Sequence, residues 1–156
     1  MVLISWSSSM KIRIFGAPGS GKTTKALQLA KEYNTPILHI DDVRYRIKYT
    51  HKRPKEERHK IIEEFITTHD DWVIEWTALG SYLPYMRQAD QVIYQNVNFF
   101  ICVWRIIRRY SALYTSTTPH TIKGILFLMR YVYDYSSFRK EDIATVSKRP
   151  TYRKIT

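Results

Sequence analysis

The sequence contains a single cysteine, Cys102, among its 156 residues. One cysteine cannot form an internal disulfide, and the apolar neighbours of Cys102 predict a small buried side chain. Because disulfide-free chains are typical of reducing compartments, we expect a cytoplasmic protein. The five histidines show no zinc-type pairing and have no second cysteine beside them, so the sequence predicts no structural metal.

The chain also lacks any run of about eighteen apolar residues, which predicts that no helix spans a membrane. The most apolar segments, Phe99 to Ile107 and Gly124 to Tyr133, each contain an arginine and predict core-packing helices. Residues 1–9 have neither the positive start nor the apolar centre of a signal peptide, and we expect them to be a flexible extension. Since 44% of the chain is hydrophobic, residues 10–156 are expected to form one domain.

Acidic residues are few, with 14 Asp and Glu against 25 Lys and Arg, which gives a formal charge of +11 at pH 7. Such a surplus favours anionic partners, either nucleotide phosphates or nucleic acid, or else reflects a soluble basic surface. The basic clusters lie at Arg44 to Lys60 and Lys148 to Lys154. Net charge does not distinguish among these three interpretations.

The most informative segment matches the pattern G-x-x-x-x-G-K-[ST] without a mismatch. Its residues are Gly16, Ala17, Pro18, Gly19, Ser20, Gly21, Lys22, Thr23 and Thr24. Glycines allow successive backbone N–H groups to point at phosphate oxygens, and the positive end of a following helix adds to the attraction. We expect Lys22 to reach the β- and γ-phosphates and the Thr23 hydroxyl to hold Mg²⁺. The motif therefore predicts binding of ATP, or another nucleoside triphosphate, with Mg²⁺.

The sequence around the motif argues against a chance match. Lys11 to Phe15 alternates polar and apolar residues, as expected of a strand that leads into such a loop. The segment from Thr24 to Glu32 has apolar residues at helical spacing. A phosphate loop must stand between a strand and a helix, and this one does.

Strands and helices alternate along the rest of the chain. Further strands are expected at Pro36–Ile40, Trp72–Trp76 and Gln91–Val97, and helices from Pro54, at Ser81–Arg87, at Phe99–Tyr114 and at Thr121–Tyr135. This order predicts an α/β, three-layer P-loop NTPase fold with a parallel sheet of four or five strands and helices on both faces. For a fifth strand only Arg153 to Thr156 is left.

In such a sheet, ligands bind at the carboxyl ends of the strands. Asp41 and Asp42 follow the second strand, and Glu75 to Thr77 closes the third. Asp41 is a candidate to accept or orient the hydroxyl proton of a phosphoryl acceptor. The alternative is that Asp41 or Asp42 caps the helix that follows.

The loop resembles that of adenylate kinases and related small-molecule kinases. The run from Met10 to about Tyr135 also resembles small adenylate-kinase-like P-loop proteins, among them the DNA topology modulation proteins. Three segments carry this second resemblance: His39-Ile40-Asp41-Asp42, Asp71-Trp72-Val73-Ile74 and Arg105-Ile106-Ile107-Arg108-Arg109.

In adenylate kinases the helix after the fourth strand carries an Arg-x-x-x-Arg pair, which Arg105 and Arg109 match. The resemblance implies that Arg105 lies against the adenine or reaches a phosphate, and that Arg109 clamps phosphate oxygens. Residues four apart share a helix face, and guanidinium groups suit phosphate oxygens. The alternative is a solvated basic face that includes Arg108.

Two segments depart from the adenylate kinase pattern. Glu75-Trp76-Thr77 replaces the Asp-Gly pair after the third strand, and Glu75 is either a residue that reaches Mg²⁺ through water or a structural acid. The segment from Ser111 to Thr121 contains no arginine or glycine, unlike a long lid that encloses donor phosphates. These departures argue against adenylate kinase activity itself.

The sequence thus predicts an ATP-dependent, Mg²⁺-assisted phosphotransferase that acts on a small acceptor, which includes a nucleotide. Lys22, Asp41, Arg105 and Arg109 are its candidate catalytic residues. The alternative function is a nucleotide-binding regulatory protein that acts on nucleic acid. Tyrosines and tryptophans more often pack in cores and on helix faces than stack on nucleobases, and the sequence contains no recognised nucleic-acid-binding module. Both observations favour the phosphotransferase.

Overall fold

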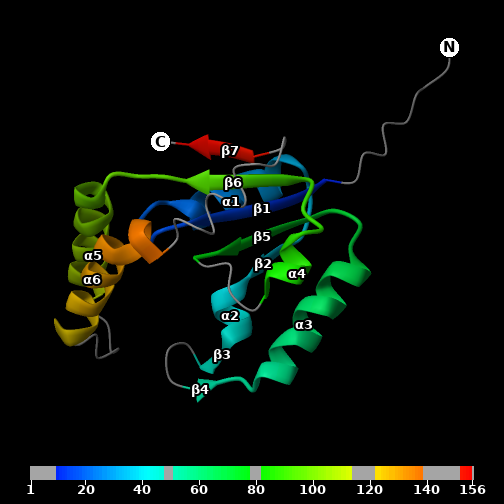
Figure 1. Ribbon diagram of the computed structural model, residues 1–156, viewed down its shortest axis with the longest axis horizontal. Helices are drawn as coiled ribbons and strands as arrows, with labels where there is room; N and C mark the ends of the chain where they lie inside the picture. Colours follow the sequence, from blue (N-terminus) through cyan, green and yellow to red (C-terminus); the bar gives the residue numbers. More distant parts are fainter. Residues whose placement is uncertain (1–9, 48–50, 78–81, 114–121, 139–151, 156) are drawn as a thin grey trace, which may run out of the picture.

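The computed structural model describes residues 10–47, 51–77, 82–113, 122–138 and 152–155 (Figure 1). Its strands are β1 (Lys11–Gly16), β2 (Ile37–His39), β3 (Tyr45–Ile47), β4 (His51–Lys52), β5 (Trp72–Trp76), β6 (Gln91–Gln95) and β7 (Tyr152–Ile155). Its helices are α1 (Lys22–Glu32), α2 (Ile40–Arg44), α3 (Lys55–Thr68), α4 (Leu83–Met86), α5 (Phe99–Leu113) and α6 (Ile122–Phe138). The expected extension at residues 1–9 lies outside the described residues.

Five strands form one sheet in the order β2-β5-β1-β6-β7, and every neighbouring pair is parallel. This arrangement confirms the predicted fold class. The fifth strand, which had little support in the sequence, is β7 at the edge beside β6. The backbone N–H of Asn96 donates to the carbonyl of Ile155 at 2.7 Å and extends this pairing.

Helices cover both faces of the sheet. Alternate residues of each strand point to opposite faces, and apolar residues on each face pack against helices. On one face, Ile12, Ile14, Val73 and Ile93 pack against Ala26, Leu29 and Ala30 of α1. On the other, apolar residues of β1, β5 and β6 pack against α2, α3 and α6. Pro54 precedes α3 as its N-cap, and Ile62 and Ile66 are the buried residues of that helix. The three-layer prediction is therefore confirmed.

The polar residues of β1 alternate with apolar ones, which suggests a strand with one solvent-exposed face, but the structure shows no such face. Arg13 is only 2% exposed, and its guanidinium lies 5.0 Å from the ring centroid of Phe15. Since β1 is a central strand between two helical layers, neither of its faces is solvated. The polar positions of this strand thus do not mark an exposed face.

The helices α5 and α6 pack against each other through Cys102, Ile106 and Val132. Figure 1 shows them side by side, beyond the end of the sheet toward which β6 and β7 point. The prediction that both are core-packing helices is correct for one side only. Phe100 is 76% exposed and Phe127 67% exposed, because the sheet does not extend under these faces.

A helix after the second strand entered the sequence analysis only as the alternative role of Asp41 or Asp42 as a cap, and α2 begins at Ile40, before either aspartate. The β3–β4 hairpin, whose strands pair antiparallel, was not predicted. Both follow β2, and Figure 1 shows them leading away from the sheet on the side of α3. Within the part of the chain that the structure describes, no helix has both the length and the apolar character that crossing a membrane requires.

Candidate phosphate-binding site

The predicted phosphate loop connects the carboxyl end of β1 to the start of α1. Gly19 and Gly21 have φ angles of +79° and +86°, a left-handed backbone that side-chain-bearing residues rarely adopt. Between them, the N–H of Ser20 donates to the carbonyl of Ala17 at 3.1 Å and closes a tight turn. The glycines at these positions are what allow the loop to curl.

The loop also lies closely against its neighbours. A Cβ atom on Gly16 would come within 2.6 Å of the carbonyl oxygen of Gln95, and one on Gly19 within 2.5 Å of the carbonyl oxygen of Cys102. The side chain of Cys102 is fully buried, as the sequence predicted. Burial raises the pKa of this thiol, while the charges of Arg105 and Lys22 act in the opposite direction.

The start of α1 is open to an anion. Gly21 is its N-cap, no side chain caps the helix there, and no acidic residue stands in its first turn. The first N–H groups of a helix have no partner within it. The buried hydroxyl of Ser20 has no hydrogen-bond partner among the residues that the structure describes, and Thr23 is exposed. These features fit a phosphate group, with the Thr23 hydroxyl available to a hydrated Mg²⁺.

Lys22 is buried behind the loop and faces a carboxylate. Its Nζ lies 3.6 Å from Oε1 of Glu75 in β5 and donates to the carbonyl of Ala17 at 3.5 Å. The other oxygen of this carboxylate, Oε2, accepts a hydrogen bond from Nδ1 of His39 at 3.0 Å. Burial raises the pKa of Glu75, but the His39 hydrogen bond and the Lys22 charge together outweigh it and hold the pKa below its ordinary value.

The sheet register explains why these side chains meet. His39 in β2 stands opposite Glu75 in β5, which in turn stands opposite Ile14 in β1. Neighbours in register point to the same face of a parallel sheet, here the face that α1 covers. Glu75 therefore lies on the α1 side of the sheet, where Lys22 begins that helix.

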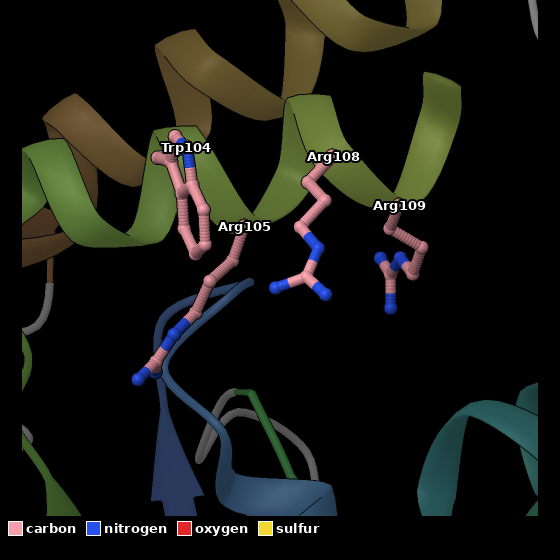
Figure 2. Close-up of a pocket in the computed structure, with 4 residues that line it drawn as sticks. All are labelled: Trp104, Arg105, Arg108 and Arg109. Carbon is pink, nitrogen blue, oxygen red and sulfur yellow. The ribbon is translucent and has the colours of Figure 1, made fainter. Parts of the chain in front are cut away.

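Arg105 contacts the loop directly. Its Nη1 donates to the carbonyl oxygens of Gly19 and Ser20, each at 3.3 Å. Four residues of α5 line an open pocket of about 450 Å³, namely Trp104, Arg105, Arg108 and Arg109. Figure 2 shows their side chains extending from the same side of α5, with Arg105 reaching the loop.

Arg105 and Arg109, the two members of the predicted arginine pair, have different surroundings in the structure. Arg105 joins α5 to the phosphate loop, so it is more than part of a solvated face. Arg108 lies 5.3 Å from the ring centroid of Trp104. Arg109 lines the same pocket and is exposed, and its role in clamping phosphate stays a prediction.

Asp41 lies in the first turn of α2, two residues beyond His39. His39, rather than Asp41 or Asp42, occupies the N-cap position of this helix. The aspartates instead stand in the first turn, where negative charge favours the helix dipole. Asp41 is half-buried just beyond the carboxyl end of β2, where His39 stands opposite Glu75 of β5. The role of Asp41 toward an acceptor stays a prediction.

Sequence reasoning missed Arg53, which fixes α2 in place. Its Nη1 donates to the carbonyl oxygens of Asp42 and Tyr45 at 2.6 and 2.8 Å, and its Nε donates to Glu57. Arg46 also pairs with Glu57, at 2.6 Å. Only the run of basic residues hinted at this arrangement, because the acceptors are backbone carbonyls that no side-chain pattern reveals.

The similarity of this chain to known proteins is weaker in sequence than in fold. No known protein-family model matches the chain. The uncharacterized protein YqaC of Bacillus subtilis is 32% identical over 69 residues, which cover 44% of this chain and only 39% of that protein.

Two solved structures are similar over most of the chain. The shikimate kinase from Acinetobacter baumannii, in complex with shikimate, has a TM-score of 0.63 at 18% identity and covers 96% of this chain and 84% of its own. The shikimate kinase from Bacteroides thetaiotaomicron has a TM-score of 0.58 at 15% identity and covers 87% and 82%. At these identities the similarity establishes that the chain has the fold seen in these P-loop kinases.

Proposed function

We propose that this protein is an ATP-dependent phosphotransferase, which transfers the γ-phosphoryl group to a small acceptor with the assistance of Mg²⁺. The observation that carries the proposal is the curled loop between β1 and α1, with an uncapped helix start and Lys22 beside it. Phosphoryl transfer requires alignment and positive charge rather than covalent chemistry from the protein, and this loop supplies both.

Each residue has a distinct role in this proposal. Loop amides and Lys22 bind the β- and γ-phosphates, and Thr23 holds the metal ion. Arg105 adds positive charge beside the loop. Arg109, one turn further along α5, binds phosphate oxygens. The bound nucleotide supplies the transferred group, and Mg²⁺ offsets the charge of its phosphates.

Trp104 gives the pocket beside the loop an aromatic surface. Its side chain is 57% exposed and lines the pocket together with the three arginines. Aromatic faces stack on any nucleobase, and guanidinium groups attract phosphates. We assign the base of the donor nucleotide to this pocket.

The acceptor belongs at the carboxyl ends of β2 and β5, with Asp41 orienting its hydroxyl group. The neighbouring Acinetobacter structure contains shikimate, so hydroxylated carboxylic acids are a class of acceptor to test first. Nucleotides and sugars follow. We further propose that residues 10–156 form a single domain and that the protein works in the cytoplasm.

Transfer of labelled phosphate from ATP to a panel of shikimate, mononucleotides, sugars and small hydroxy acids tests this function. We expect one acceptor class to be labelled, and labelling to depend on Mg²⁺. Absence of transfer to every acceptor, despite ATP binding, would contradict the proposal. Hydrolysis alone is not an adequate readout, because a kinase without its acceptor still turns over ATP slowly.

A second candidate is a nucleotide-binding regulatory protein that acts on nucleic acid. The exposed Trp104 beside three arginines is the observation that favours it, because single-stranded nucleic acid binds to stacking platforms within positive surfaces. Such binding weakens steeply with salt, so that log K falls linearly with log salt. Salt-sensitive DNA binding without transfer to any acceptor would favour this candidate over a phosphotransferase.

A further inference from the structure

The buried carboxylate of Glu75 is the least explained group beside the loop. It is 6% exposed and has two partners, Lys22 through one oxygen and His39 through the other. A buried charge must be paired, since removing one partner from such a pair is strongly destabilising. Any change in the partners of Glu75 therefore has to be compensated.

Triphosphate binding makes such a change. At 3.6 Å from Glu75 and 3.5 Å from the Ala17 carbonyl, Nζ of Lys22 is held by two long contacts. Phosphate oxygens bring more negative charge than these groups and draw the ammonium toward the loop. Glu75 then keeps a single described partner, His39, whose side chain is 25% exposed and within reach of solvent protons.

We propose that His39 is a positioning residue for Lys22, acting through Glu75, and that it takes up a proton when a triphosphate draws Lys22 away. In the empty site the Nδ1–H of His39 holds Oε2 of Glu75, which leaves Oε1 facing Lys22. On binding, a solvent proton adds to the imidazole, and the resulting imidazolium replaces Lys22 as the cation paired with Glu75. No bond of the nucleotide changes in this step.

The surrounding charges are compatible with this exchange. Among the described residues, Lys22 from α1 and His39 from β2 are the charged or titratable groups that act on the pKa of Glu75. The neighbour of Glu75 in β1 is the apolar Ile14. His39 is the N-cap of α2, whose positive end disfavours an imidazolium, and the negative charges of Asp41 and Asp42 in the first turn of this helix act in the opposite direction.

This inference rests on triphosphate binding at the loop, and its test separates the two. The Kd for ATP is measured without Mg²⁺ from pH 6.5 to 8.5 for the wild type, His39→Gln and the control His69→Gln. Glutamine still donates a hydrogen bond but does not titrate. His69 contacts the Phe65 carbonyl at the end of α3 and serves as a matched histidine outside the site.

We expect the ratio of the Kd values of His39→Gln and wild type to rise as pH falls, by up to about tenfold per unit for one linked proton. The nucleotide's own titration cancels in this ratio, and His69→Gln should follow the wild type. A ratio that does not vary with pH, or the same pH dependence in His69→Gln, would overturn the role of His39.

Calorimetry of the wild type in buffers of different ionisation enthalpy gives a second readout that needs no variant. At pH about 8 the terminal phosphate of ATP is already ionised in solution, since the second pKa of a phosphate monoester is about 6, so the nucleotide releases no proton on binding. Proton uptake on ATP binding is expected at this pH, and its absence would overturn the inference even if His39→Gln did not fold. Failure of the wild type to bind ATP at any pH would instead overturn the proposed function, and the inference with it.

Discussion

The ammonium of Lys22 lies 3.6 Å from the carboxylate of Glu75, so the lysine of the phosphate loop is paired with a buried acid before any phosphate arrives. This pair joins α1 to β5, the strand next to β1, and holds the buried Lys22 side chain behind the loop. Because the carboxylate also accepts a hydrogen bond from His39, the three elements α1, β5 and β2 are linked through the side chain of Glu75.

Replacing Glu75 with glutamine should lower the free energy of unfolding at pH 7 by about 1–3 kcal/mol, because two partners lose a charged acceptor. The folded pKa of Glu75 lies below its ordinary value of 4.5, so its ionised form stabilises the protein above that pH. This contribution disappears as the pH falls through the folded pKa. Urea unfolding followed by tryptophan fluorescence between pH 3 and 8, roughly the span of carboxyl titration, should show the two proteins converging in acid. A constant difference across this range would contradict the pairing.

Replacing Gly19 with alanine should disrupt the loop, because the new Cβ would lie 2.5 Å from the carbonyl oxygen of Cys102. We expect a loss of about 1–3 kcal/mol of stability and weaker ATP binding. Gly21→Ala is the matched comparison, since its backbone is also left-handed but its Cβ would meet only the flexible Arg105 side chain at 3.4 Å. Equal effects of the two substitutions in thermal unfolding would show that the packing against α5 is unimportant.

Replacing Trp104 with alanine should raise the Kd for ATP about tenfold and leave the Kd for inorganic tripolyphosphate unchanged, because stacking acts on the base alone. Phe100→Ala is the control, since Phe100 is exposed on the same helix but does not line the pocket. Isothermal titration with both ligands distinguishes the two. Equal weakening for ATP and tripolyphosphate would place the base elsewhere.

Much of this fold could be predicted because its signals are local. The glycine and lysine pattern of residues 16–24 specifies a loop by backbone chemistry. Short apolar runs predicted β5 with its observed bounds, and β6 with its observed start but an end at Val97 rather than Gln95. β7 is polar and lies at an edge, so backbone pairing with β6 rather than an apolar pattern forms it. That signal is absent from the sequence of residues 152–155.

The site was predicted less completely because its contacts cross between strands. Glu75 was left as either a structural acid or a residue near Mg²⁺, and nothing local indicated that His39 stands opposite it. That relation follows from the register between β2 and β5, which depends on the packing of the whole sheet. In the same way, the burial of Arg13 depends on the two helical layers rather than on its neighbours in sequence.

The most direct test of the account is the ATP affinity and phosphoryl-transfer rate of Lys22→Ala compared with Lys25→Ala. Both lysines belong to α1, but Lys25 contacts only Gln28 among the hydrogen bonds described for its side chain. We predict that Lys22→Ala weakens ATP binding and slows transfer about 100- to 1,000-fold, whereas Lys25→Ala behaves like the wild type. Undiminished binding and turnover in Lys22→Ala would contradict the central claim that this loop holds the triphosphate.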